Sequence, residues 1–431
     1  MSQPSTAVSA TKIDRCRVCG NTELIPCIDI GEQYLSSVFP TDLNYRSTAV
    51  RYPLDMVMCK KRPPTLEASG DAGTCGLIQL GHRLDLSAMY DAYPYTSSTN
   101  SSMGKILQDV AESGRTLNHL QPEDVILDIG GNDGTLLSFF RDDPYQLISI
   151  DPAQNVKSLM DGPRYTDVRT SFNEQAFKTV SAKKAKLIFS IAMFYHLNDP
   201  VGFARDVAAC LDDEGVWIIQ MAYLPAMIRT NMYDNIVHEH AGYYAAHHMK
   251  WLMEQVGLEV FDVMENDVYG GSFRVFVKKK GCERFVPTER YQKILERELK
   301  EGLFDPTTYH TFMQRVQKTR DDLCALLKKI KQDGKTVWIY GASTKGNTIL
   351  QYCNLGHEEI AAAADSNPFK VGKYVIGSDI PIKSEEDMRR AKPDFLLALP
   401  YSFIDGFIKR EADLVAGGTK FIVPLPEVKI V

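Results

Sequence analysis

Two groups of side chains in this chain have the types and spacing to bind a metal or move protons. The first is a set of cysteines near the start, and the second is a glutamate flanked by histidines. Cys16 and Cys19 enclose two residues and precede Gly20, which is typical of a tight turn that aims two thiolates at one tetrahedral ion. Such a site needs a second pair, which Cys59 and Cys75 supply. The four cysteines therefore predict a zinc ion.

The second pair is unusual because residues 60–74 separate its two cysteines, where two intervening residues are the rule. This span contains Pro, Gly and Ser, so we expect a loop inserted into the turn. Its length adds only about 1–2 kcal/mol to the cost of closure. Four thiolates leave no open position on the ion, so the predicted zinc is structural. Two alternatives stay open: Cys27 replaces one ligand, or the thiols are reduced and hold no metal.

An apolar run over residues 125–129 leads into a glycine-containing turn and then a helical pattern. Glycines at the carboxyl end of a strand let the backbone approach a ligand closely. The next predicted strand ends in a carboxylate about twenty residues on, where it could bind both hydroxyls of a ribose. The predicted cofactor-binding residues are Asp128, Gly130, Asn132, Gly134 and Asp151.

Two cofactors use such a loop. The pyrophosphate of NAD would lie near the start of the helix, where the carboxylate of Asp133 would repel it. S-adenosylmethionine carries a sulfonium cation and no phosphate, and Asp128 before the turn fits the pattern of methyltransferases. We therefore expect S-adenosylmethionine rather than NAD, with a purely structural turn as a further alternative.

Histidines occur at two places where such a fold would carry chemistry. The predicted strand 186–191 leads to His196, at the sheet edge where cofactor and acceptor meet. Farther on stands His238-Glu239-His240, whose histidines are too close together for a zincin motif. An imidazole oriented by a carboxylate suits a base that works near pH 7. The alternatives are a packing role for His196 and a polar loop cluster for the triplet.

Two further segments offer candidate groups. Tyr93 and Tyr95 lie in a linker, where a phenol could donate to an enolate oxygen or pack at a domain interface. Lys345 and Asn347 follow Gly341 in a turn after a predicted strand, and the pattern departs from a Walker A loop. This turn is suited to a diphosphate, or it is structural.

Composition bounds the scaffold that positions these groups. The chain has 431 residues and a net charge of −6, which indicates two or three domains and gives no electrostatic footprint for nucleic acid. Apolar runs alternate with helical patterns, which predicts an α/β fold with a parallel sheet covered on both faces. Neither a secretory signal nor a bilayer-spanning stretch is apparent. The nine cysteines, an odd number, favour a reducing cytoplasmic compartment.

These patterns divide the chain into five predicted parts. They are a disordered tail (1–14), a zinc-binding module (15–85), a methyltransferase domain (86–285), a helical connector (286–333) and a Rossmann-like domain (334–431). Strands are predicted at 125–129, 146–150, 186–191, 216–220 and 271–277, and later at 336–340, 360–364, 394–399 and 420–423.

The sequence resembles the zinc-containing deoxysugar C-methyltransferases, which act on nucleotide-linked 4-keto-6-deoxy sugars. The resemblance covers nearly the whole chain. The motifs that carry it are Cys16-x-x-Cys19-Gly, Cys75-Gly-Leu-Ile-Gln-Leu, Tyr93-Pro-Tyr95-x-Ser-Ser, Asp128-Ile-Gly-x-Asn-Asp-Gly134, His238-Glu-His240, Gly270-Gly-Ser-Phe-Arg274, Tyr340-Gly-Ala-Ser-x-Lys-Gly-Asn347 and Asp365-x-Asn-Pro.

The resemblance implies a zinc module, a class I methyltransferase domain and a C-terminal Rossmann-like domain that helps hold the nucleotide sugar. It implies that His240 removes a proton from C3, beside a C4 ketone, that Glu239 belongs to the site, and that His196 and Tyr95 stabilise the enolate. The substrate-binding residues it implies are Tyr93, His238, Arg274, Lys345 and Asn347. We expect a nucleotide-activated keto-sugar as the partner, no nucleic acid or membrane, and a monomer or weak dimer.

Departures from the family pattern keep other functions open. Val237 stands where the family usually has a tyrosine, Gln220-Met221 stands where Glu-Val is more typical, and the second cysteine pair carries the insertion. The alternatives are methylation of an oxygen or nitrogen on a sugar or natural product, and a catalytically silent nucleotide-sugar-binding homologue.

Overall fold

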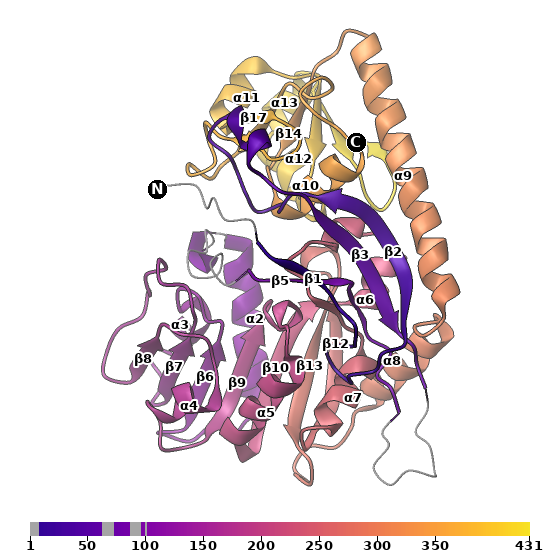
Figure 1. The fold of residues 1–431 in the computed structure, drawn as a ribbon. Helices are drawn as coiled ribbons and strands as arrows, with labels where there is room; N and C mark the ends of the chain where they lie inside the picture. Colours follow the sequence, from indigo (N-terminus) through magenta and orange to yellow (C-terminus); the bar gives the residue numbers. More distant parts are fainter. Residues whose placement is uncertain (1–7, 63–72, 87–95, 100) are drawn as a thin grey trace.

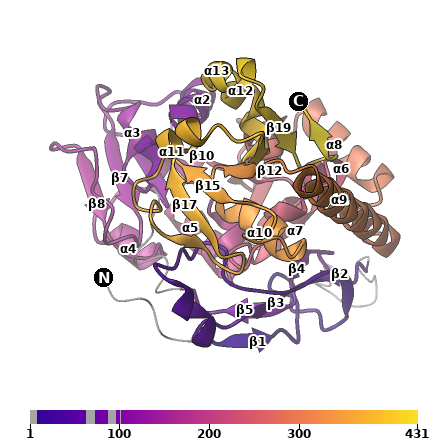
Figure 2. The same cartoon turned by 90° about the horizontal axis from the view of Figure 1, so that it is seen from above.

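The computed structural model describes residues 8–62, 73–86, 96–99 and 101–431. In that part of the chain, two seven-stranded sheets are accompanied by a four-stranded sheet and a two-stranded one (Figure 1). The N-terminal strands lie along one side of the molecule, against both larger sheets (Figure 2). Among the described helices, none is both long enough and apolar enough to cross a membrane.

The N-terminal strands form an antiparallel sheet in the order β11-β4-β3-β2. The edge strand β11 (Gly242–Tyr243) comes from the central part of the chain, one residue after the His238-Glu239-His240 triplet. This pairing fastens the triplet to the N-terminal sheet. The other bounds are β2 (Leu24–Gln33), β3 (Tyr52–Cys59) and β4 (Ile78–Leu80).

The tail does not match the expectation of disorder up to residue 14. Strand β1 (Ala10–Lys12) pairs antiparallel with β5 (His82–Leu84), and the amide of Ile13 donates to the carbonyl of Gly81. The side chains of β1 are exposed, so the sequence has no apolar pattern there that would predict a strand. Backbone hydrogen bonds, which do not depend on side-chain type, hold this strand in place.

The central sheet has the order β12-β13-β10-β9-β6-β7-β8. The apolar runs form strands as predicted, because a strand buried on both faces needs a continuous apolar sequence. The strands are β6 (Val125–Ile129), β7 (Gln146–Ile150), β8 (Tyr165–Val168), β9 (Ala185–Ile191), β10 (Leu211–Ala222), β12 (Leu258–Asn266) and β13 (Ser272–Lys279). The helices are α2 (Ser101–Leu117), α3 (Thr135–Ser138), α4 (Glu174–Lys178), α5 (Pro200–Cys210), α6 (Leu224–Arg229) and α7 (Ala246–Glu254).

This sheet is mixed, which corrects the prediction of a parallel sheet. Strand β13 runs antiparallel to β10, and β12 runs antiparallel to β13. Strand β12 was not predicted, because Glu259, Asp262 and Glu265 interrupt its apolar residues. Buried Asp262 is held by the hydroxyl of Thr288 and the guanidinium of Arg290, which lie well beyond the strand in sequence.

The C-terminal sheet repeats the doubly wound arrangement, in the order β16-β17-β15-β14-β18-β19-β20. Its five inner strands are parallel. The strands are β14 (Val337–Tyr340), β15 (Ala362–Asp365), β16 (Tyr374–Val375), β17 (Ile380–Ser384), β18 (Phe395–Ala398), β19 (Lys420–Val423) and β20 (Lys429–Ile430). The helices are α10 (Thr344–Tyr352), α11 (Glu385–Ala391), α12 (Ile404–Arg410) and α13 (Ala412–Ala416).

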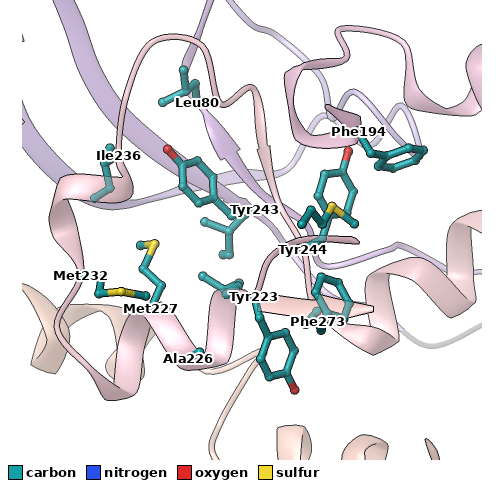
Figure 3. Packing of buried hydrophobic residues seen from close by; sticks show 14 of the residues in the cluster. Leu80, Phe194, Tyr223, Ala226, Met227, Met232, Ile236, Tyr243, Tyr244 and Phe273 are labelled. Atoms are coloured by element: carbon teal, nitrogen blue, oxygen red, sulfur yellow. The ribbon is translucent and has the colours of Figure 1, made fainter. Parts of the chain in front are cut away.

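Two helices join the larger sheets, α8 (Glu289–Lys300) and the long α9 (Pro306–Gln332). Helix α9 begins where Asp305 caps it and Pro306 occupies its first turn. It runs beside β2 and reaches the C-terminal unit (Figure 1). A cluster of buried hydrophobic residues connects the N-terminal sheet with the central unit, and in it Leu80 of β4 lies near Tyr243 of β11 (Figure 3).

Candidate active site

The four predicted zinc ligands come together. The Sγ atoms of Cys16, Cys19, Cys59 and Cys75 all lie within 4.8 Å of one another. Cys16 Sγ is 3.4 Å from Cys75 Sγ, and Cys19 Sγ is 3.5 Å from Cys59 Sγ. Four thiolates around zinc, each about 2.3 Å from the ion, are about 3.8 Å apart in a tetrahedron, so this cluster fits zinc.

Local backbone contacts explain how the knuckles form despite the insertion. The amide of Gly20, with φ +70°, donates to the carbonyl of Cys16 and closes the first turn. Two hydrogen bonds join Arg62 and Thr74 at the base of the insertion. The amide of Arg62 donates to Thr74 Oγ1 (2.7 Å), and the amide of Thr74 donates to the carbonyl of Arg62 (2.9 Å). The insertion therefore leaves the second pair in place. Cys27 lies outside the cluster, and burial raises the pKa of its thiol to about 12.

The glycine loop follows β6, at the point where the strand order of the central sheet reverses. Gly130, Asn132 and Gly134 all have positive φ. A Cβ on Gly131 would lie 2.5 Å from Ser149 Oγ, so only glycine fits there. The carboxylate of Asp151 accepts from the amides of Asn132 (2.9 Å) and Ala153 (2.8 Å). Asp151 is thus held at the end of β7, beside the loop.

Carboxyl groups surround this loop, which bears on the cofactor. Buried Asp128 lies near Asp151 and Asp133, and desolvation, reinforced by those two charges, raises the pKa of its carboxyl to about 8. A cationic ligand would relieve this crowding, whereas a pyrophosphate would aggravate it. The site therefore fits S-adenosylmethionine and not a dinucleotide.

The linker after the N-terminal sheet returns to the same loop. The amide of Ser97 donates to Asn132 Oδ1, and the amide of Ser98 donates to Asp133 Oδ2, both at 2.9 Å. The side chain of Asn132 is therefore partly used in holding the linker. Tyr93 and Tyr95, predicted to contact substrate, lie outside the described residues.

The two predicted acid/base histidines meet. The rings of His196 and His240 are stacked, with centroids 5.4 Å apart and an angle of 24° between their planes. His196 ends the short 3₁₀ turn η3 (Phe194–His196), which follows β9, and His240 precedes β11. Both therefore lie at the carboxyl edge of the central sheet, next to the glycine loop.

Hydrogen bonding and burial define the protonation states of this pair. His240 Nδ1 is 2.8 Å from the carbonyl oxygen of Asn235. Because a carbonyl only accepts, Nδ1 carries the proton and Nε2 keeps a free lone pair. Burial, together with His196 and Lys345, lowers the pKa of His240 well below its ordinary value. Burial also lowers the pKa of His196 to about 3, so both imidazoles are neutral at pH 7.

The rest of the triplet lies toward the N-terminal sheet. His238 and Glu239 line a cavity of about 230 Å³ together with His196 and residues of the N-terminal sheet. His238 Nε2 lies 3.2 Å from the carbonyl oxygen of Tyr52, and burial lowers the pKa of His238 to about 4. Glu239 has Ser37 as a hydrogen-bond partner, and burial raises its pKa. That Glu239 orients an imidazole of the triplet stays a prediction.

The C-terminal unit adds Tyr401, which the sequence did not reveal, and Lys345, which was predicted. Buried Asp234, on the 3₁₀ turn η4 (Tyr233–Asn235), accepts a 3.0 Å hydrogen bond from the hydroxyl of Tyr401. Lys345 acts electrostatically on both Asp234 and His240. Its ammonium lies 5.7 Å from the centre of the Tyr269 ring.

These contacts join the two points where strand order reverses. Tyr401 follows β18 and Lys345 follows β14, and the order of the C-terminal sheet reverses between these two strands. In doubly wound sheets, ligands bind at that edge. The corresponding edge of the central sheet carries His196 and the glycine loop. The two edges therefore face each other across Asp234 and His240.

Two residues predicted to bind substrate have other partners. Arg274 is only 2% exposed, and its guanidinium donates to Gln220 Oε1, to the carbonyl and carboxylate of Asp109, and to Ser113. This residue holds α2 against the sheet, so its assignment to substrate is corrected. Asn347 is buried and donates to the carbonyl of Ser36, 3.3 Å away, so it joins the C-terminal unit to the N-terminal module.

Three family models match successive parts of the chain. A zinc binding domain matches residues 16–90, a methyltransferase domain matches residues 101–263, and a C-methyltransferase C-terminal domain matches residues 267–426. The C-methyltransferase NovU of Streptomyces niveus is 28% identical over 421 residues, which cover 97% of each protein.

Solved structures resemble a smaller part. The CcbJ methyltransferase of Streptomyces caelestis is 11% identical, with a TM-score of 0.32, over 46% of this chain and 97% of that protein. The methyltransferase CalO1 of calicheamicin biosynthesis, solved with S-adenosylhomocysteine bound, is 15% identical, with a TM-score of 0.32, over 41% of this chain and 54% of that one. Neither likeness bears on substrate or mechanism.

The sheet, its glycine loop and the matched domains define an S-adenosylmethionine-dependent methyltransferase. The matches at both ends narrow this class, since they make the chain similar to zinc-containing C-methyltransferases along nearly its whole length.

Proposed function

We propose that this enzyme methylates the carbon next to the ketone of a nucleotide-linked keto-deoxysugar, at C3 beside a C4 carbonyl. The observation that carries the proposal is the stacked pair of neutral imidazoles, His196 and His240, at the carboxyl edge of the central sheet. Methylation at carbon needs a base and a group that holds the enolate oxygen, whereas an oxygen or nitrogen acceptor already has a lone pair.

His240 is the base in this proposal. Its Nδ1 proton is held by the carbonyl of Asn235, so Nε2 is free to take a proton from the carbon next to the ketone. A buried neutral imidazole is available as a base without first losing a proton to water. Lys345 disfavours the new positive charge on His240, and the Asp234 carboxyl, which acts on Lys345, would offset part of that effect.

His196 holds the enolate oxygen. The low pKa of His196 leaves its imidazole neutral, with one N–H that can donate a hydrogen bond to a developing oxyanion. We propose that Tyr95 assists as a second donor. His238, Glu239 and Tyr93 would contact the sugar, since the first two line the cavity that His196 shares.

The methyl donor would be held by the glycine loop, through Asp128, Gly130, Asn132, Gly134 and Asp151. When bound, S-adenosylmethionine supplies an electrophilic methyl group on a sulfonium centre. Asp151 is fixed by two amides and is placed to bind ribose hydroxyls. Asp128 provides negative charge for the cationic part of the ligand.

The nucleotide would lie at the facing edge of the C-terminal sheet. Lys345 stands in the first turn of α10, which Ser343 caps and where Gly346 lets the helix approach Leu399 closely. An ammonium at a helix start suits a diphosphate. The sugar on that diphosphate would then reach His240, because Lys345 is close enough to His240 to lower its pKa.

The test is to incubate the enzyme with labelled methyl donor and a panel of nucleotide keto-sugars, and to locate the label by NMR. The proposal predicts a new carbon–carbon bond next to the ketone. Label on an oxygen or nitrogen would make the enzyme a different methyltransferase. Tight binding of the sugars without transfer would make it a silent homologue.

A further inference from the structure

Tyr195 completes a triangle of rings with the two histidines. Its ring centroid is 4.3 Å from that of His240 and 4.5 Å from that of His196. Its plane is tilted by 59° from that of His240 and by 80° from that of His196. Both imidazoles therefore pack on one phenol ring, at distances typical of aromatic contact.

The next residue along the chain shows why Tyr195 stays in place. Phe194 has 0% exposure and packs on Tyr244 at 5.3 Å and on Trp217 at 5.8 Å. Figure 3 shows Phe194 in the buried cluster beside Tyr244. With Phe194 anchored in the core, the two half-buried residues that follow it, Tyr195 and His196, are carried at the edge of the site.

The separation of the histidines matches the task proposed for them. A carbon and the oxygen of a neighbouring carbonyl are about 2.4 Å apart. Two nitrogens that reach these atoms over about 3 Å must themselves be only a few ångströms farther apart. Rings with centroids 5.4 Å apart satisfy this condition, and the ring of Tyr195 adds a packing contact to the hydrogen bond with Asn235 that restrains His240.

We propose that Tyr195 is a positioning residue, whose ring is the common wall that fixes the relative orientation of His196 and His240. The inference rests on the proposed function, because it assigns the histidine pair to one substrate. Both contacts that carry the inference, with His196 and with His240, are made by the Tyr195 ring, so the role is assigned to the ring.

Three substitutions separate the possible roles of Tyr195. Tyr195→Phe keeps the ring, Tyr195→Leu keeps volume without a flat face, and Tyr195→Ala keeps neither. Tyr145→Ala is the matched control, because Tyr145 is a half-buried tyrosine that precedes β7, at the opposite edge of the same sheet. Each variant is assayed for methyl transfer with the keto-sugar, for zinc content, and for S-adenosylhomocysteine affinity by calorimetry.

We expect Tyr195→Phe to transfer methyl at close to the wild-type kcat. Tyr195→Leu and Tyr195→Ala should lose about 100-fold in kcat, which is typical of a misplacement of about 1 Å, with little change in KM. Zinc content and S-adenosylhomocysteine affinity should be unchanged in all of them. Solvent deuterium exchange next to the ketone, without methyl donor, should fall in parallel with kcat.

Three results would overturn the inference. They are wild-type kcat in Tyr195→Ala, a Phe variant as defective as the Ala variant, and loss of zinc or ligand binding in both the Leu and the Ala variants. Failure of the proposed function is a separate result: the wild-type enzyme would then show no deuterium exchange with any keto-sugar of the panel.

Discussion

The hydroxyl of Tyr401 donates a 3.0 Å hydrogen bond to Oδ1 of Asp234, across the junction between the C-terminal unit and the central one. Asp234 is only 4% exposed, and one residue farther on, Asn235 holds His240 through its carbonyl oxygen. The C-terminal unit therefore reaches to within a few bonds of the candidate base.

Removal of this bond should weaken binding of the acceptor. Tyr401→Phe deletes one hydrogen bond to a buried carboxyl, which is worth about 1.5 kcal/mol, or roughly a tenfold change in affinity. We expect KM for the keto-sugar to rise about tenfold. Affinity for S-adenosylhomocysteine should not change, because the glycine loop lies in the other unit. Tyr374→Phe, on the edge strand β16, is the control; equal effects of both variants would contradict the assignment.

The cysteine cluster predicts about one zinc ion per chain by elemental analysis. Replacing Cys16 and Cys19 together with serine should remove the metal and expose the N-terminal sheet to proteolysis, because those residues tie its ends together. Cys27→Ser, outside the cluster, should keep the zinc. A double variant that is metal-free but still protease-resistant would show that no zinc module exists.

Binding of the methyl donor should release a proton. Burial and neighbouring carboxylates raise the pKa of Asp128 to about 8, so this carboxyl is mostly protonated at pH 7. A cationic ligand stabilises the charged form and lowers that pKa. Calorimetry at pH 7, in buffers of different ionisation enthalpy, should detect up to about one proton released. The release should vanish in Asp128→Asn; proton uptake by the wild type would contradict this prediction.

The pH profile should reflect histidines that are neutral over an unusually wide range. Burial lowers the pKa of His196 to about 3, and burial with His196 and Lys345 lowers that of His240. A base whose pKa is lowered stays competent above that pKa and fails only as pH falls through it. At saturating methyl donor, kcat/KM should therefore stay level from pH 8 to below pH 6.5. An acid limb with a midpoint above 6.5 would contradict a desolvated base; among the described residues, Tyr195, Tyr243 and Lys345 are further titratable groups close to this imidazole.

Local sequence predicted the main strands and the cysteine cluster. The continuous apolar runs of β6 and β7 end as predicted, because the pattern and the burial are both local properties. The cysteine cluster could also be predicted, because the spacing of Cys16 and Cys19 is a local pattern that is typical of a metal site.

What escaped prediction depends on contacts between distant segments. The family resemblance assigned Arg274 to the substrate. Its partners Asp109 and Gln220 lie 165 and 54 residues away along the chain, so no local pattern could reveal them. Asp234 and Tyr401 are 167 residues apart. Tyr195 contacts His240 only because the fold brings the segment before β11 to the end of β9.

The most direct test of the account follows the hydrogen next to the ketone. The enzyme, loaded with S-adenosylhomocysteine in place of the methyl donor, is incubated with the nucleotide keto-sugar in deuterium oxide and followed by NMR. We predict exchange of that hydrogen by the wild type, and a loss of at least about 100-fold in His240→Asn with ligand affinity retained. Undiminished exchange in His240→Asn, or none in a wild type that still transfers methyl, would contradict the central claim that this imidazole generates the carbon nucleophile.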